Sequence, residues 1–421
     1  MPHYYLWTIG CQMNKAESER IGSHLEQLGY RPAAAAVEAD IIVLNSCVVR
    51  QSAENKVINK VKSLNALKKA QPEVTLAVTG CLVNSDIALL RKNFPHVDYF
   101  FRPGEHLPWL NAPEPDETLP QHPSPTAYVP IIQGCNNFCA YCIVPYRRGR
   151  EKSRTVDEIA CEVRELVRRG VKEATLLGQN VDSYGHDLPE KPDLADLLAE
   201  LNGIEGLARI RFLTNHPKDM SQKLIDAVAS LDKVCEHISL PVQSGSDDIL
   251  ALMRRGYTSA QYRELVEKIR SRVPGVALST DVIVGFPSET EAQFQQTFDL
   301  LSDLKFDAVH VAAYSPRPGT LAARELEDSV PREVKKERLS AIERLQGKTL
   351  TELNEALLGQ TVEVLVEGEV KSKWQGRTRT DKIVFFSHNH NYVGRLVTVK
   401  IEKTGPWSLQ GRVNNETKEE L

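Results

Sequence analysis

The sequence predicts an α/β fold in three parts: an N-terminal open parallel α/β sheet domain, a central partial or full (β/α) barrel, and a small antiparallel β-barrel near the C-terminus. Three observations predict it. Short apolar runs alternate with amphipathic helical stripes up to about residue 358, which is typical of parallel sheets covered by helices. A proline-rich stretch divides this series into two. After about residue 359 the pattern changes to the two-residue alternation of β-strands.

The first part, residues 1–102, contains three apolar runs that we expect to be buried strands: Tyr4–Ile9, Ile41–Asn45 and Thr75–Thr79. Two helices are expected between them, Ala16–Leu28 and Ala53–Leu67. Each helix carries apolar residues at helical spacing, namely Ile21, Leu25 and Leu28 on the first and Val57, Val61 and Leu64 on the second. The order of elements predicts a parallel sheet with covering helices.

A cysteine follows each of these three expected strands: Cys11, Cys47 and Cys81. In open α/β sheets, ligands bind outside the carboxyl ends of the strands. Neighbouring strands lie about 4.8 Å apart, so adjacent ends would bring the three thiols to within roughly 10 Å of each other. The pattern favours a shared iron–sulfur site with one open iron over the alternative that each cysteine is a small buried apolar residue.

The central part, residues 126–358, follows a linker at residues 103–125. Seven prolines exclude regular helix from this linker: Pro103, Pro108, Pro113, Pro115, Pro120, Pro123 and Pro125. Beyond it we expect strands at Tyr128–Ile132, Ala174–Leu177, Arg209–Leu213, His237–Val242, Ser279–Val284 and Ala308–Tyr314. Amphipathic helices are expected between them, and a last long helix runs from Arg332 to about Leu358. The residues after these strands are polar or rich in Gly and Pro, which suits the catalytic rim of a barrel.

A C-x-x-x-C-x-x-C triplet, Cys135, Cys139 and Cys142, follows the first strand of this central part. Structural zinc normally takes four protein ligands, and no paired knuckle follows these three. A 4Fe–4S cluster held by three cysteines leaves one iron open for another ligand. The spacing therefore favours a cluster with one reactive iron over an unusual zinc site.

The third part, residues 359–416, is locally basic. Between residues 371 and 412, nine basic residues stand against two acidic ones, and five aromatic residues are interleaved with them. Basic and aromatic side chains on a small barrel suit RNA, although a solvated charged face over an ordinary core is the alternative. We expect RNA contacts from this part and from the loop after the cysteine triplet, at Lys371, Lys373, Arg377, Arg379, Arg147, Arg148 and Arg150.

Composition excludes several classes. The chain has 421 residues with a net charge of −4, so any nucleic-acid surface must be local. Eight cysteines are too few for a disulfide scaffold at this length, and six of them lie in the two triplets, which indicates a reducing compartment. The first residues lack a signal-peptide pattern, and no apolar run is long enough to span a membrane, so we expect a cytoplasmic protein without membrane contact.

The strand Tyr128–Ile132 and the cysteine triplet resemble the radical S-adenosylmethionine (SAM) superfamily. In that superfamily the open iron binds SAM, and one electron cleaves SAM to a 5′-deoxyadenosyl radical. The resemblance implies SAM contacts from Tyr141 at the adenine, Gln179 at the amino group, Gln243 and Ser244 near the ribose and carboxylate, and Val284 and Gly285 near the adenine.

All three parts together resemble the methylthiotransferases, which join an N-terminal cluster domain, a radical SAM core and a C-terminal TRAM domain that binds RNA. Three motifs resemble the branch that modifies isopentenylated tRNA adenosines: Thr8-Ile9-Gly10-Cys11-Gln12-Met13-Asn14, Asn45-Ser46-Cys47-Val48-Val49-Arg50, and Ile143-Val144-Pro145-Tyr146-Arg147-Arg148-Gly149-Arg150-Glu151. The branches acting on a ribosomal-protein aspartate or on threonylcarbamoyladenosine usually show Pro-Lys-Asn or Lys-Val-Asn after the first cysteine, and Gln12-Met13-Asn14 departs from both.

The resemblance implies transfer of a methylthio group to C2 of N6-isopentenyladenosine beside the tRNA anticodon. It also implies two 4Fe–4S clusters, an auxiliary one on Cys11, Cys47 and Cys81 and a SAM-binding one on Cys135, Cys139 and Cys142, with all six cysteines catalytic. SAM would serve as methyl donor and as radical source. The expected partners are the tRNA anticodon stem-loop, a small reducing electron-transfer protein and a sulfur donor, and we expect a monomer.

Two alternatives stay open at this point. One is a methylthiotransferase with a different substrate, either a ribosomal-protein aspartate or threonylcarbamoyladenosine in tRNA. The other is a non-catalytic iron–sulfur RNA-binding sensor, which would not need an open iron beside a polar pocket. Cys161 and Cys235 belong to neither triplet, and we interpret them as packing residues; we interpret His216 as structural or RNA-facing.

Overall fold

The computed structural model describes residues 1–83, 86–105, 107, 109 and 119–413. Pro108, Pro113 and Pro115 of the expected linker, and residues 414–416 of the expected third part, lie outside these ranges. The chain divides into two compact units. The first unit contains Met1–His122, Gln133–Phe138 and Cys142–Glu151, and the second contains the other described residues.

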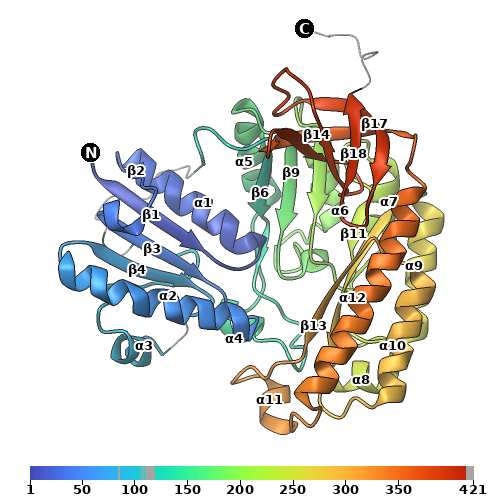
Figure 1. The fold of residues 1–421 in the computed structure, drawn as a ribbon, viewed down its shortest axis with the longest axis horizontal. Coiled ribbons are helices and arrows are strands. Elements are labelled where there is room, and N and C mark those ends of the chain that lie inside the picture. The colour runs from blue at the N-terminus through green and yellow to red at the C-terminus, as the bar shows by residue number, and fades with distance from the viewer. Residues whose placement is uncertain (84–85, 106, 108, 110–118, 414–421) are drawn as a thin grey trace. The chain divides into compact units, whose positions relative to one another are not determined.

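The first unit is built on a five-stranded parallel sheet ordered β2-β1-β3-β4-β5 (Figure 1). Its strands are β1 (His3–Thr8), β2 (Arg31–Pro32), β3 (Ile41–Ser46), β4 (Thr75–Gly80) and β5 (Tyr99–Phe100). The helices are α1 (Gln12–Gln27), α2 (Gln51–Ala70), α3 (Ile87–Asn93) and α4 (Val144–Arg148), with a short 3₁₀ helix, η1 (Ala36–Glu38). The predicted open parallel sheet is confirmed.

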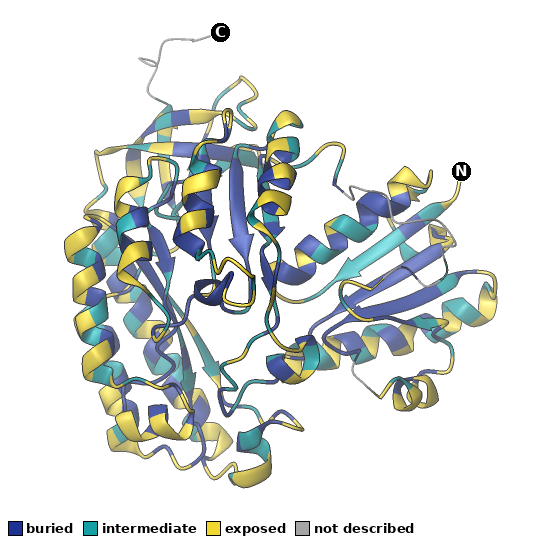
Figure 2. Ribbon diagram, turned by 180° about the vertical axis from the view of Figure 1, so that it is seen from behind, coloured by how far each residue is buried: buried dark blue, intermediate teal, exposed yellow. Residues whose placement is uncertain are grey.

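Both faces of this sheet are buried, because successive residues of β3 pack to opposite sides. Ile42 and Leu44 join the core under α2, whereas Ile41 and Val43 pack with Leu25 of α1. Figure 2 shows β3 and β4 buried along almost their whole length. The predicted stripe of α2 is buried, but Leu28 is exposed, because α1 ends one residue before it.

The second unit contains six parallel strands: β6 (Thr126–Pro130), β9 (Glu173–Leu177), β10 (Arg209–Phe212), β11 (His237–Ser239), β12 (Ala277–Val284) and β13 (Ala308–Ala313). They form two sheets ordered β10-β9-β6 and β11-β12-β13, which a bridge between Ile210 and Val234 links. Among the described residues no strand pairing joins β13 to β6, so the predicted barrel is the partial form. Two short strands, β7 (Ile132–Gln133) and β8 (Lys152–Ser153), precede and follow the cysteine triplet along the chain.

Helices connect these strands: α5 (Val156–Arg168), α6 (Leu194–Asn202), α7 (Gln222–Ser230), α8 (Asp247–Leu252), α9 (Ser259–Arg272), α10 (Glu291–Leu304), α11 (Leu321–Glu325) and α12 (Arg332–Glu355), with a 3₁₀ helix, η2 (Val181–Ser183). Helix α5 begins at a reciprocal capping box between Thr155 and Glu158, and α6, α9 and α10 begin in the same way. Among the described residues, no helix is long and apolar enough to cross a lipid bilayer.

A small closed barrel ends the second unit, with strands β14 (Thr361–Val370), β15 (Lys373–Arg377), β16 (Ile383–Phe386), β17 (Leu396–Thr404) and β18 (Leu409–Val413). Its order is β14-β15-β16-β18-β17, and the pairs are antiparallel except β16 with β18. Gly376 and Gly411 are required by close packing, because a Cβ there would lie 2.2 Å from the carbonyl oxygens of Leu365 and Lys400 respectively.

This barrel contacts the amino ends of the central strands through buried arginines. Arg209, at the start of β10, donates to the carbonyl oxygen of Arg377 at 2.8 Å. Arg211 donates to the carbonyl oxygen of Arg379 at 3.0 Å and also pairs with Glu173 of β9. The carboxyl ends of the central strands, at the opposite edge, are left for other ligands.

Candidate functional site

Cys11, Cys47 and Cys81 lie at the carboxyl ends of three neighbouring parallel strands, as predicted. The sheet order places β1, β3 and β4 side by side, with Thr8 opposite Asn45 and Ser46 opposite Gly80. Cys47 and Cys81 directly follow β3 and β4, and Cys11 lies three residues after the end of β1. Cys11 is also the N-cap residue of α1. Cys47 and Cys81 are buried, and Cys11 is exposed.

Asn14 and Asn45 tie the three strand ends together, a role that the sequence did not predict. The Asn14 amide donates to the backbone carbonyl of Ser46 at 2.8 Å and to the side-chain oxygen of Asn45 at 3.1 Å. Asn45 in turn donates to the backbone carbonyl of Asn14 at 2.8 Å. The Cys11 thiol lies 3.5 Å from the Asn14 side-chain oxygen. The sequence signal for this role is an asparagine close to each of two strand-end cysteines: Asn14 lies three residues after Cys11, and Asn45 lies two residues before Cys47.

Two glycines let the strand ends approach one another. Gly10 and Gly80 have φ values of 140° and 88°, which disfavour other residues. A Cβ on Gly10 would lie 2.9 Å from the Cβ of Cys47, and one on Gly80 would lie 2.3 Å from the backbone oxygen of Ser46. Side chains at these two positions would therefore push the cysteine-bearing turns apart.

The thiols of this group interact with one another and with Arg148. The pKa of Cys47 is raised to about 11, chiefly by burial and also by Cys81 and Cys11, while Arg148 opposes the rise. Burial also raises the pKa of Cys81, again against Arg148. Among the described residues, no three His, Cys, Asp or Glu side chains form a ready-made site for a single metal ion. The donor set is three sulfurs on adjacent turns, which fits a thiolate-bound cluster.

The second triplet lies on a loop that is divided between the two units. In the first unit, Cys135 donates its backbone N–H to the carbonyl oxygen of Gly149 at 3.2 Å, and Asn136 hydrogen-bonds Glu151. Gly134 has no room for a side chain, because a Cβ would lie 2.0 Å from the carbonyl oxygen of Arg150. In the second unit, the buried Cys139 thiol accepts a hydrogen bond from Arg255 at 3.3 Å.

The residues predicted to contact SAM have different surroundings. Tyr141 packs against the cluster of Ala140, Phe286 and Tyr314. Gln243 follows β11 with φ at 71° and is buried, and its side-chain oxygen has no hydrogen-bond partner among the described residues.

Two of the other residues predicted to contact SAM, Ser244 and Gly285, already have hydrogen-bond partners within the protein. The Ser244 hydroxyl lies 3.2 Å from that of Thr297 on α10, so it already has a partner. Val284 is fully buried, Gly285 donates its N–H to Glu289 at 2.6 Å, and Gln179 is half-buried after β9. Gln243 is therefore the member of this set with an unused buried polar atom.

Further buried polar atoms without partners gather after β9 and β10. They are the side-chain oxygens of Asn180 and Asn215 and Nε2 of His216, considering only the described residues. All three residues are at most 5% exposed. A buried polar group normally has a partner, so these atoms are available to a polar ligand or to water at the carboxyl ends of the strands. The unpartnered atoms of Asn180, Asn215 and His216 therefore fit a polar cofactor such as SAM.

His216 is held in one tautomer in this region. Its Nδ1 accepts a hydrogen bond from the backbone N–H of Lys218 at 3.2 Å, so a neutral ring carries its proton on Nε2. The pKa of His216 is lowered to about 2, chiefly by burial and also by the nearby charge of Arg255. The ring is thus a neutral donor at physiological pH.

Comparison with known proteins covers all three parts of the chain. Residues 3–102 match the model of the uncharacterized protein family UPF0004, residues 129–301 match the radical SAM superfamily and residues 355–413 match the TRAM domain. A tRNA-2-methylthio-N(6)-dimethylallyladenosine synthase from Dehalococcoides mccartyi strain CBDB1 is 60% identical over 415 residues, which cover 99% of each chain. A synthase of the same name from Chloroflexus aurantiacus is 48% identical and covers 99% of this chain and 94% of its own.

The chain belongs to the tRNA-2-methylthio-N(6)-dimethylallyladenosine synthase family. The predicted resemblance is confirmed, and with it an enzyme that uses SAM and a 4Fe–4S cluster. Among solved structures, the radical SAM methyltransferase TsrM from Kitasatospora setae matches with a TM-score of 0.52 at 12% identity, covering 77% of this chain and 74% of its own. The radical SAM enzyme OxsB matches with a TM-score of 0.51, covering 82% and 56%. These matches concern the fold alone.

The residues predicted to bind RNA differ in exposure within this family member. Arg150 is exposed and lies over the ring of Phe138 at 4.4 Å, and Arg147 is half-buried. Lys371 and Lys373 are exposed at the turn between β14 and β15. For these four residues RNA contact stays a prediction.

Three arginines of the same set are already engaged inside the protein. Arg377 pairs with Asp381 at 3.0 Å, and Arg379 pairs with Glu236 at 2.7 Å. These ion pairs compete with the predicted RNA contacts. The side chain of Arg148 is 2% exposed, so a phosphate contact does not fit its position, and that prediction is revised.

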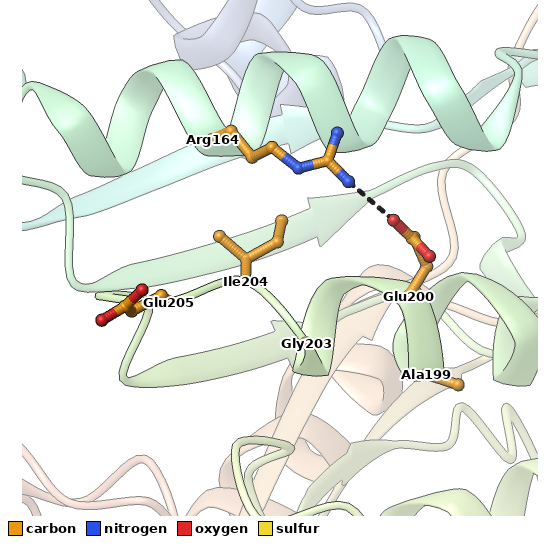
Figure 3. Close-up of a pocket in the computed structure, with 6 residues that line it drawn as sticks. All are labelled: Arg164, Ala199, Glu200, Gly203, Ile204 and Glu205. Atoms are coloured by element: carbon orange, nitrogen blue, oxygen red, sulfur yellow. Dashed lines mark hydrogen bonds and ion pairs between the residues drawn. The ribbon is translucent and has the colours of Figure 1, made fainter.

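Two other features lie outside the proposed chemistry. Cys235 is buried, but Cys161 is exposed on α5, so the packing interpretation of Cys161 was wrong. A pocket of about 420 Å³ lies between α5 and α6, where Arg164 pairs with Glu200 (Figure 3). It lies toward the amino end of β10, because its other lining residues include Gly203, Ile204 and Glu205, which precede that strand.

Proposed function

We propose that this protein transfers a methylthio group to C2 of N6-dimethylallyladenosine in tRNA. The observation that carries the proposal is the 60% identity, over essentially the full length of both chains, to a synthase named for this product. The motif Cys11-Gln12-Met13-Asn14 and the C-terminal TRAM match are consistent with a tRNA substrate. The C2–H bond of adenine is neither acidic nor electrophilic, so the reaction needs a cofactor that supplies radical chemistry.

We assign two cluster sites to the chain. Cys135, Cys139 and Cys142 would hold the cluster that binds SAM, and Cys11, Cys47 and Cys81 would hold an auxiliary cluster. When bound, the first cluster would supply the electron that cleaves SAM, and the second would supply sulfur for methylation by another SAM molecule. The glycine turns and the Asn14 network support the auxiliary assignment, since they hold three thiols at neighbouring strand ends.

The residues of the central strands would bind and orient SAM and the adenine base. Gln243, Asn180, Asn215 and His216 offer buried polar atoms that a ligand would satisfy. The neutral His216 would donate from Nε2 without adding charge. The other predicted SAM contacts, Tyr141, Gln179, Ser244, Val284 and Gly285, remain part of this proposal.

The remaining parts of the proposal concern partners. The tRNA would be bound through its anticodon stem-loop, with Arg147, Arg150, Lys371 and Lys373 near its phosphates. A small reducing protein would supply electrons, and a separate donor would restore sulfur. A monomer acting in the cytoplasm, where its tRNA substrate is found, is the simplest arrangement.

Replacing one cysteine from each triplet tests this proposal. We expect Cys139→Ala to abolish the dithionite-dependent cleavage of SAM, because the reactive cluster loses a ligand. Cys47→Ala should still form 5′-deoxyadenosine but give no methylthiolated nucleoside. Cys161→Ala is the matched control, since this cysteine is exposed on α5 and belongs to neither triplet. The readouts are 5′-deoxyadenosine and methylthiolated nucleosides in isopentenylated tRNA, measured by mass spectrometry.

Two outcomes would contradict the proposal. Normal product formation by Cys47→Ala would remove the auxiliary cluster from the reaction. Transfer to ribosomal small-subunit protein, with none to isopentenylated tRNA, would assign the chain to a different substrate. A wild-type protein that never forms 5′-deoxyadenosine would instead favour the non-catalytic sensor.

A further inference from the structure

Arg148 is a buried cation beside the three cysteines of the first unit. Its side chain is 2% exposed, although it lies on a short helix, α4, within a run of basic residues. Its Nη2 lies 3.0 Å from the side-chain oxygen of Asn14, and that oxygen lies 3.5 Å from the Cys11 thiol. Its charge also opposes the rise in pKa that burial causes in Cys47 and Cys81. A buried charge is costly unless it has partners, so this position needs a structural or chemical reason.

Two residues of α1 hold the guanidinium in place. Glu17 accepts from Nη1 of Arg148 at 2.5 Å and from Nη2 at 3.4 Å. The side-chain oxygen of Asn14 accepts from Nη2 at 3.0 Å. Asn14 is also the residue that links the turns after β1 and β3, so Arg148 is fixed to the framework that holds the cysteines. The hydrogen bonds to Glu17 and Asn14 therefore fix the orientation of the guanidinium.

The charge of this group suits a thiolate cluster. Three thiolate ligands bring negative charge into a partly buried site, and a hydrogen bond to a cluster sulfur stabilises the more reduced state. Arg148 supplies both a positive charge and a donor, whereas Glu17, which pairs with it, supplies an opposing negative charge. Residues that contact ligands rather than the metal commonly tune such centres.

We propose that Arg148, oriented by Glu17 and Asn14, is a positioning residue that sets the reduction potential of the iron–sulfur cluster on Cys11, Cys47 and Cys81. This inference rests on the proposed function, which assigns that cluster. It also replaces the phosphate contact expected for Arg148, because a tRNA phosphate has no access to a side chain this buried.

The test uses the full-length chain with Cys135, Cys139 and Cys142 replaced by alanine, so that only the auxiliary cluster assembles. Its midpoint potential is measured by a redox titration followed by electron paramagnetic resonance. Arg148→Met should shift the potential to more negative values, by about 59 mV if the reduced state is disfavoured tenfold in this one-electron couple. Glu17→Gln should shift it the opposite way, because that change removes a negative charge.

Shifts of the midpoint potential in opposite directions distinguish an electrostatic effect from structural damage. Damage to the site would not reverse the direction of the shift according to the sign of the charge that is removed. Arg148→Lys should restore part of the shift, and Arg91→Met, on the exposed surface of α3, should cause none. If Arg148→Met does not retain iron, the shift in Glu17→Gln decides the matter. Unchanged potentials, or shifts of the same sign, would overturn the role of Arg148. Failure of the parent chain to bind iron would overturn the two-cluster function and this inference with it.

Discussion

At the residue scale, Asp182 shows how burial controls charge near the carboxyl ends of the central strands. It lies in η2, after β9, and accepts hydrogen bonds from the Asn215 side chain at 2.5 Å and from the backbone N–H of His216 at 2.8 Å. These bonds favour the carboxylate, but burial outweighs them and raises the pKa of Asp182 to about 7, from an ordinary value of 3.8. Asp182 therefore titrates close to physiological pH.

This shift predicts a pH dependence of stability. The folded state holds the Asp182 proton more tightly than the unfolded chain, so this group makes the free energy of unfolding fall as pH rises from about 4 to about 7. Its contribution is at most about 4 kcal/mol, because one pKa unit corresponds to about 1.4 kcal/mol. Asp182→Asn does not titrate, so its stability should fall less, or rise more, across this window. Urea unfolding of both proteins between pH 4 and 8 checks this; parallel curves would contradict it.

Residue type and spacing in the sequence indicated the cluster ligands. They did not indicate residues whose roles depend on neighbours that are distant in the sequence. The six triplet cysteines were predictable, because cysteines at this spacing and at successive strand ends are typical of cluster ligands and of few other sites. Asn14 and Arg148 were not assigned these roles, because their hydrogen bonds join separate segments of the chain: Asn14 bonds residues 31 and 32 positions away, and Arg148 bonds Asn14 across 134 positions. The buried atoms of Asn215 and His216 were missed for the same reason, since only the folded strands show that their polar groups lack partners.

At the element scale, the loop between β15 and β16 joins the C-terminal barrel to the central strands. Arg211 of β10 pairs with Glu173 of β9 at 3.0 Å, with both side chains 4% exposed, and also donates to the backbone carbonyls of Thr378 and Arg379. Lys382 adds an ion pair with Asp307 at 2.9 Å. These contacts couple the barrel to the strands on which it rests.

We predict that Arg211→Leu destabilises the protein by about 3–5 kcal/mol, because it leaves the Glu173 carboxylate buried without its partner. Arg164→Leu is the control: it removes an exposed pair with Glu200 and should cost about 0–1 kcal/mol. The double variant Glu173→Leu/Arg211→Leu should recover part of the loss. Urea unfolding measures all three, and equal effects of the two single substitutions would contradict the prediction.

Element types were predictable where the apolar pattern was strong. The three strands and two helices predicted for the first unit, and α5 with its capping box, lie close to their predicted ranges, whereas β2, β5, α3 and α4 were not predicted. The short strands β15, β16 and β18 did not stand out, because four or five residues carry little periodicity and their register is fixed by closure of the barrel.

At the scale of the whole molecule, a chain of net charge −4 is proposed to bind a polyanion. Attraction must therefore come from local groups whose charges are not already paired. Arg148, Arg377 and Arg379 form ion pairs within the protein, which reduces the set predicted from composition. Lys371 and Lys373 remain exposed at the turn between β14 and β15, so they are the stronger candidates on the C-terminal barrel.

This selection predicts how tRNA binding depends on salt. Each bound phosphate releases condensed counterions, so Lys371→Ala/Lys373→Ala should weaken binding and lower the slope of log affinity against log salt by about 1 for each phosphate that is no longer bound. Lys336→Ala/Lys348→Ala removes two exposed lysines from α12 and should change neither quantity. Fluorescence anisotropy with an isopentenylated anticodon stem-loop, at several salt concentrations, measures both. An unchanged slope in the first variant would show that this turn does not bind the phosphates, and would move the expected RNA surface to Arg147 and Arg150.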